Sequence, residues 1–192
     1  KRWIWELIQN AKDCSKEAKN SIQDTDQIPF KRVNQGVDIK IIYDVSQNIV
    51  IFKHNGFPFT NETLDSLMYK ITTKDDDENS TGRFGTGFMT SHTLSRVVVI
   101  HAPFLLHAND SWERSYIEAT VFREGSTDKQ LAQEFLEMEK SKKKFDYDPN
   151  NEEHNWTSFT YKLTSDLGIN SAKLGIQSFR ENIMKLLLFC DD

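Results

Sequence analysis

Two short runs of β-branched residues lie close together in the first third of the chain and limit the folds open to it. Residues 37–43 and 49–53 each favour a strand, and the polar tripeptide Ser46-Gln47-Asn48 lies between them. A short polar spacer between two such runs is typical of an antiparallel hairpin. A sheet that begins in this way does not follow the alternating strand–helix–strand series of a parallel sheet.

The remaining pattern adds helices and dispersed strands. Apolar periodicity and composition predict helices over residues 2–20, 61–69, 88–94, 128–143 and 171–189, and strands over 97–100, 116–122 and 157–163. With 192 residues the chain is long enough for one domain with a substantial core. We therefore expect a single α+β domain over residues 1–192. It should be a two-layer α/β sandwich with a mixed, mostly antiparallel sheet and helices on one face, and segment 128–155 should be an insertion.

Charge and cysteine content narrow the function classes. The net charge of −5 argues against nonspecific binding to nucleic acid or anionic lipid, since both need a basic face. The dense basic run at residues 140–144 is interpreted as a solvated helix end. Cys14 and Cys190 lie near opposite ends without metal-ligand spacing, so we expect no disulfide framework and a cytoplasmic location. The longest apolar run, residues 184–190, is too short to span a membrane, and no membrane association is expected.

The first predicted helix has an apolar side and a polar side. The apolar side carries Ile4, Leu7, Ile8 and Ala11. On the other side, Glu6, Asn10 and Asp13 are spaced i, i+4 and i+7 and lie within roughly 60° of one another around the helix axis. A face of this kind is most often a solvated surface. It also presents a carboxylate that can accept a proton and an amide oxygen that suits a hard cation.

A glycine cluster, Gly82-Arg83-Phe84-Gly85-Thr86-Gly87-Phe88, precedes the third predicted helix. Glycines allow backbone N–H groups to approach a polyphosphate closely, and a helix that follows points its positive end at the same anion. Such clusters are also common in ordinary turns. The context fits neither a P-loop, which needs Gly-Lys-Ser/Thr, nor a dinucleotide fold, which needs a preceding strand. The acidic segment 74–80 before the cluster is expected to be a mobile loop.

These motifs together resemble the GHKL ATPases, the family of the Bergerat fold. Residues 6–13, Glu-Leu-Ile-Gln-Asn-Ala-Lys-Asp, resemble the family's N-box, and residues 82–88 resemble its second glycine box in the form found in heat-shock chaperones. The resemblance implies that Glu6 activates the attacking water and that Asn10 is a magnesium ligand. Asp13 is expected to lie at the nucleotide. Residues 82–88 would hold the phosphates, and segment 74–80 would be the ATP lid.

The chain departs from the family at the first glycine box, which reads Asp-x-Gly-x-Gly. His54, Asn55 and Gly56 stand there, and Pro58 replaces the second glycine. In the family the aspartate accepts a hydrogen bond from the adenine amino group, and neutral imidazole can accept the same bond in the right tautomer. The resemblance further implies that Thr157, on a late strand, lies beneath the adenine.

The resemblance implies a magnesium-dependent module that binds ATP and ADP, hydrolyses ATP and acts as a conformational switch in a larger protein. Histidine kinases of this fold have asparagine at the position of Glu6, so the glutamate favours a hydrolase. A nucleotide-dependent homodimer through the parent protein is also expected. The alternative is a degenerate, non-catalytic module that binds nucleotide or a protein partner.

Overall fold

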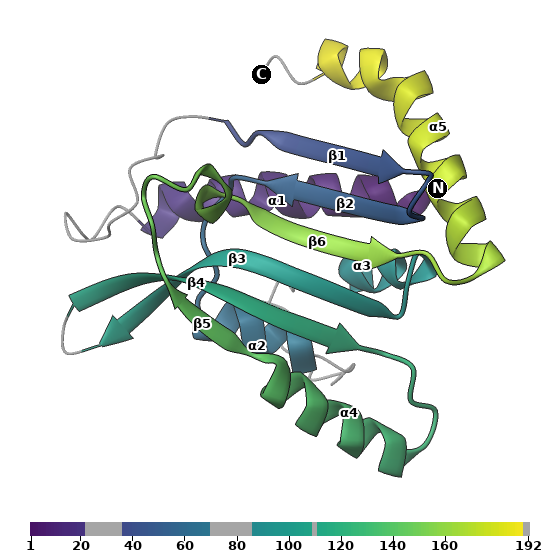
Figure 1. Cartoon of the computed structure of the whole chain (residues 1–192). Helices are drawn as coiled ribbons and strands as arrows, with labels where there is room; N and C mark the ends of the chain where they lie inside the picture. Colours follow the sequence, from purple (N-terminus) through teal and green to yellow (C-terminus); the bar gives the residue numbers. More distant parts are fainter. Residues whose placement is uncertain (22–35, 70–85, 109–110, 190–192) are drawn as a thin grey trace, which may run out of the picture.

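The computed structural model describes residues 1–21, 36–69, 86–108 and 111–189 (Figure 1). The helices are α1 (Arg2–Ser21), α2 (Asn61–Tyr69), α3 (Thr86–Met89), α4 (Asp128–Ser141) and α5 (Asp166–Phe189), with short 3₁₀ helices η2 (Thr90–Thr93) and η3 (Glu152–Asn155). The strands are β1 (Ile39–Asp44), β2 (Ile49–His54), β3 (Val97–Ala108), β4 (Ser111–Phe122), β5 (Lys143–Asp146) and β6 (Thr157–Lys162).

The described strands form one six-stranded sheet in the order β1-β2-β6-β3-β4-β5. Each neighbouring pair is antiparallel. β6, the last strand in sequence, therefore lies between two hairpins, with Phe159 opposite Phe52 on one side and Ile100 on the other. The predicted α+β class and the hairpin at residues 37–53 are confirmed. The sheet is less mixed than predicted, because its one described parallel contact is an isolated bridge between Phe59 and Phe104.

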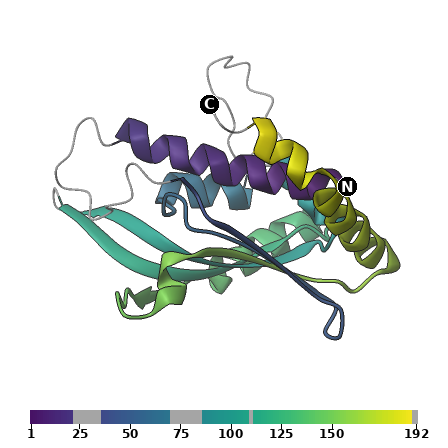
Figure 2. The ribbon, with the colours of Figure 1, turned by 90° about the horizontal axis from the view of Figure 1, so that it is seen from above.

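The helices cover one face of this sheet, as Figures 1 and 2 show. The alternation of side chains along a strand explains this arrangement, since Val50, Phe52 and His54 of β2 are buried while the residues between them are partly exposed. The helix-covered face contributes Phe52, Ile100, Phe159 and Tyr161 to the core, each at most 2% exposed. Burying an aliphatic or phenylalanine side chain of this kind stabilises a fold by about 1.5–3 kcal/mol.

Helix α1 packs its apolar stripe against the sheet and crosses α5 at close range. Trp3, Ile4, Leu7 and Ala11 are all buried. The indole Nε1 of Trp3 donates a hydrogen bond to the Ser171 carbonyl at 2.9 Å, and the ring packs on Gly175, where any side chain would overlap it. The helix is thereby fixed with its polar side facing away from the core. None of the helices in the described part of the chain is long and apolar enough to cross a membrane.

Several element boundaries differ from the sequence predictions. β3 and β4 are much longer than predicted, α5 begins at Asp166 rather than at residue 171, and the third helix is a short α3 followed by η2. The predicted helix 128–143 ends at Ser141, and Lys143 begins β5 instead. β5 pairs with β4, where the Lys143 Nζ lies 2.7 Å from the Glu118 carboxylate. Segment 128–155, expected to be an insertion, contributes fully buried Met138 to the core.

Candidate functional site

The polar side of α1 faces the start of α3. The Glu6 side chain is 23% exposed, and its Oε1 accepts a hydrogen bond from the Arg2 Nε at 2.6 Å. Its second oxygen, Oε2, lies so close to the Gly87 backbone that a Cβ atom built there would be 2.5 Å away. The fold thus brings the predicted catalytic carboxylate against a glycine of the predicted phosphate-binding box, although the two are 81 positions apart in the sequence.

Asn10 lies one turn after Glu6 on the same helix. Its amide Nδ2 is buried and has no hydrogen-bond partner among the described residues. The oxygen and nitrogen of an amide exchange places by a simple rotation, so either group can occupy this buried position. Asp13, on the following turn, accepts a hydrogen bond from Gln9 Nε2 at 3.0 Å. Within the described ranges no group of three or more His, Cys, Asp or Glu could hold a metal ion. A cation at Asn10 would therefore need most of its oxygen ligands from a bound nucleotide or from water.

The first glycine box forms a tight turn at the end of β2, and its side chains hold the turn together. His54 is buried, and its Nδ1 accepts a hydrogen bond from the Gly56 N–H at 3.2 Å. The ring therefore carries its proton on Nε2 and offers a donor there. Asn55 is engaged with Asp38: its Oδ1 accepts from the Asp38 N–H at 2.8 Å, and its Nδ2 donates to the carboxylate at 2.6 Å.

This turn lies against α1. A Cβ atom at Gly56 would be 2.9 Å from the Cys14 Cβ, so glycine is what allows the turn to approach the helix. Cys14 follows Asn10 by four residues, which is the spacing of neighbours on one side of a helix. Sequence reasoning did not include Cys14 in the site, although this spacing indicates its position.

A small cavity of about 10 Å³ lies between the turn, α1 and β6. It is lined by Cys14, His54, Phe57, Pro58, Phe59, Thr63 and Thr157. The Thr157 hydroxyl is buried without a hydrogen-bond partner in the described part of the chain. His54 and Thr157, both predicted to contact the adenine, line this cavity together. Thr63 also lines it, and the sequence analysis did not predict this residue. The volume of the cavity suits about one water molecule, so adenine would enter here only if the lining residues moved.

The glycine cluster is described only from Thr86 onward. Gly82, Arg83, Phe84, Gly85 and the predicted lid 74–80 lie outside the described residues. Phe88 is 2% exposed, and its ring lies 5.5 Å from the Phe159 ring and 5.5 Å from the His92 ring. Phe88 thus anchors α3 to the sheet, and we assign it a structural role.

Burial sets the protonation state of His54. It lowers the pKa of this side chain from 6.5 to about 4, and it lowers that of His92 to about 4 as well. Because the folded-state pKa lies below the unfolded value, the unfolded chain takes up protons first as the pH falls. The stability contributed by a neutral His54 is therefore complete above about pH 6.5 and is lost as the pH falls towards 4.

We expect the free energy of unfolding to fall by about 3 kcal/mol over that range through His54 alone, because a tenfold difference in proton affinity between the folded and unfolded chain corresponds to about 1.4 kcal/mol. Urea unfolding at intervals between pH 7.5 and 4 measures this. The variant His54→Gln, which stays neutral, should lose part of the pH dependence. An unchanged pH profile in that variant would show that His54 is not the buried titrating group.

The sequence was compared with models of known protein families and with curated proteins, and neither comparison gave a match. The site therefore rests on the geometry of this chain. Gly87 packs against Glu6, and the turn at Gly56 packs against Cys14 further along α1. Thr157 lies with His54 at the small cavity beside that turn.

Proposed function

We propose that this chain is a magnesium-dependent ATP-binding module that hydrolyses ATP and acts as a conformational switch in a larger protein. One observation carries the proposal: the Glu6 carboxylate packs against Gly87, at the start of the helix that follows the glycine cluster. A phosphate bound at that cluster would lie beside a carboxylate able to accept a proton from water. The motif order along the chain supports the same function.

In the proposal Asn10 supplies its amide oxygen to the cation, as the N-box resemblance implies. Rotation of the amide would bring that oxygen to the buried position of Nδ2, which has no hydrogen-bond partner in the described part of the chain. Magnesium, when bound, would neutralise phosphate charge. Glu6 would orient water and hold its proton. Thr157 and the turn at Gly56 would border the base.

The proposal is tested by calorimetry with ATP in the presence and absence of magnesium, followed by measurement of phosphate release. We expect saturable binding that needs magnesium and slow turnover. No binding of ATP at millimolar concentration would contradict the proposal.

Asn10→Ala should weaken ATP binding chiefly when magnesium is present, because the lost group is a ligand of the ion. Calorimetry with magnesium and with excess chelator separates the two conditions. Gln133→Ala, at an exposed position of α4, is the control and should bind ATP as the wild type does. Equal weakening of Asn10→Ala in both conditions would instead show a direct contact with the nucleotide or a folding defect.

Gly87→Ala should reduce ATP hydrolysis while largely preserving the fold. The added methyl group meets the flexible end of the Glu6 side chain, which can move aside, and alanine is intrinsically better than glycine in a helix by about 1 kcal/mol. We expect the free energy of unfolding to change by less than about 1 kcal/mol, with clearly slower phosphate release. Wild-type turnover in this variant would show that the position of Glu6 against Gly87 does not matter for catalysis.

A second candidate function is a degenerate, non-catalytic module. It is favoured by the first glycine box, where the hydrogen bonds of His54 and Asn55 are already used within the turn. Binding without turnover, unaffected by Glu6 substitution, would support this candidate.

A further inference from the structure

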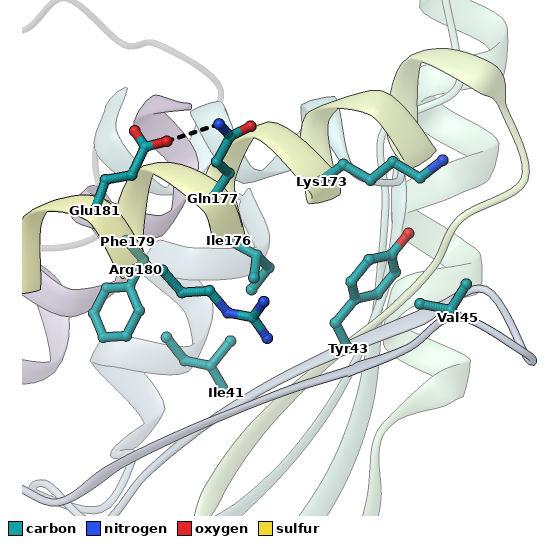
Figure 3. A pocket seen from close by; sticks show the side chains of 9 residues that line it. All are labelled: Ile41, Tyr43, Val45, Lys173, Ile176, Gln177, Phe179, Arg180 and Glu181. Carbon is teal, nitrogen blue, oxygen red and sulfur yellow. Dashed lines mark hydrogen bonds between the residues drawn. The ribbon is translucent and has the colours of Figure 1, made fainter.

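A groove lies between β1 and the middle of α5, and it shares no lining residue with the site around Glu6 and Gly87. Its volume is about 560 Å³, and it is lined by Ile41, Tyr43, Val45, Lys173, Ile176, Gln177, Phe179, Arg180 and Glu181. Figure 3 shows that Ile41 projects from β1 towards Ile176 and Phe179 of the helix. The volume and the mixture of apolar walls with a few polar groups are typical of ligand and peptide sites.

The groove exists because the helix layer is wider than the sheet at this side. Figure 1 shows the C-terminal half of α5 beyond β1, and Figure 2 shows it at the level of α1, in the helix layer. β1 pairs with β2, and no described strand pairs with its other edge. The backbone N–H and C=O groups on that edge are of the kind that accept a further strand. The groove between this edge and the overhanging helix has a volume of about 560 Å³.

The side chains around the groove indicate what such a strand would carry. The Tyr43 hydroxyl is buried and has no hydrogen-bond partner among the described residues. Lys173 and Arg180 are exposed on α5, and neither forms an ion pair with any residue that the structure describes. Glu181, by contrast, accepts a hydrogen bond from Gln177 at 2.7 Å. Two cations and one carboxylate therefore line the groove, and among the lining residues the balance of charge is positive by one.

We infer that β1 and α5 form a docking site for an extended, acidic peptide segment of a partner protein, which joins the sheet as a strand beside β1. Backbone hydrogen bonds to the β1 edge supply affinity, and alternate side chains supply specificity, as in strand addition generally. Apolar side chains of the peptide pack against Ile176 and Phe179 beneath the helix. Its carboxylates pair with Lys173 and Arg180.

A single strand fits this site better than a second copy of the chain. A second copy that paired through its own β1 would bring its own helix layer against the overhanging α5. A partner strand without a covering helix meets no such obstacle. The inference does not depend on ATP binding, because the groove shares no residue with the candidate nucleotide site.

The test uses the whole 192-residue chain and two synthetic peptides. The probe is acetyl-Glu-Thr-Val-Thr-Val-Thr-Glu, which places two valines and two glutamates on one side of a strand. The matched control replaces both glutamates with lysine. We expect the acidic probe to shift the backbone amide resonances of residues 39–45 and the lysine peptide to bind about tenfold more weakly, since two exposed ion pairs become repulsive.

Charge reversal in the protein distinguishes this site from nonspecific attraction. Arg180→Glu should reverse the preference between the two peptides. Lys129→Glu, the same change on exposed α4 at the opposite end of the sheet, should not. Equal binding of both peptides, shifts confined to the β5 edge, or no shift at β1 would each overturn the inference. Concentration-dependent protection of the β1 amides without any probe would also overturn it, because a second copy would then be the occupant.

Discussion

Glu6→Gln is expected to bind ATP as the wild type does and to lose nearly all ATP hydrolysis. Glutamine has the shape of glutamate and can still accept the hydrogen bond from Arg2, so the contact with Gly87 is kept. It cannot take a proton from water at neutral pH. Because a positioned general base contributes about 10²–10⁴-fold, the rate of phosphate release should fall by that factor. Calorimetry on the same preparation checks that ATP binding is unchanged.

The control for this result is Glu137→Gln, at an exposed position of α4. This variant should hydrolyse ATP at the wild-type rate. Turnover by Glu6→Gln that equals the wild-type rate would remove Glu6 as the base. If Glu6→Gln lost both ATP binding and ATP hydrolysis, the carboxylate would instead have a role in maintaining the structure of the site.

Phe159→Ala is expected to lower the free energy of unfolding by about 3–5 kcal/mol, the range for a buried phenylalanine. The ring is 2% exposed and meets three others: those of His54 at 6.1 Å, Phe59 at 6.4 Å and Phe88 at 5.5 Å. It therefore joins the strand that carries the first glycine box to the helix that follows the second. Equilibrium unfolding in guanidinium chloride measures the loss.

Phe145→Ala is the matched control. Phe145 is 45% exposed on the edge strand β5, so its truncation should cost less than about 1 kcal/mol. If Phe159→Ala lowered the free energy of unfolding no more than Phe145→Ala does, the packing of Phe159 would not be what holds the two glycine boxes in place.

Local chemistry is sufficient to predict some elements. The hairpin at β1 and β2 follows from two β-branched runs and a polar spacer, and Asp44 stabilises the turn by accepting hydrogen bonds from the Ser46 and Gln47 N–H groups. The bounds predicted for helix α2 match the structure to the residue. Thr60 accepts a hydrogen bond from the Thr63 N–H at its start, and Leu64, Leu67 and Met68 are buried.

Other elements depend on contacts between distant segments, which no local pattern shows. β5 exists because β4 offers it a free edge and Glu118 pairs with Lys143. The second half of β3 contains Pro103, and proline normally argues against a central strand. It is tolerated because the pairing of β3 with β6 ends at His101, and the Pro103 carbonyl accepts a hydrogen bond from the Phe59 N–H instead.

The candidate site likewise has some features that local sequence predicts and others that depend on contacts between distant segments. Helical spacing alone is enough to place Glu6, Asn10 and Asp13 on one side of α1. The contact of Glu6 with Gly87 depends on how α1 and α3 pack, which the sequence does not show. The role of His54 depends on which ring nitrogen faces the Gly56 N–H, and residue type alone cannot give that. Its contact with adenine stays a prediction. In the tautomer that the hydrogen bond from Gly56 requires, the other ring nitrogen, Nε2, is a donor.

The central place of β6 has a consequence for how the chain acquires its structure. Synthesis delivers the β1–β2 and β3–β4 hairpins first, but the strand that joins them is made near the end. Until Thr157–Lys162 emerges, β2 and β3 both present unpaired edges, the kind of surface that promotes aggregation. Pairing Phe52 with Phe159 also closes a very long loop, and high contact order of this kind slows folding. The two hairpins can therefore join into one sheet only after the last strand has been synthesised.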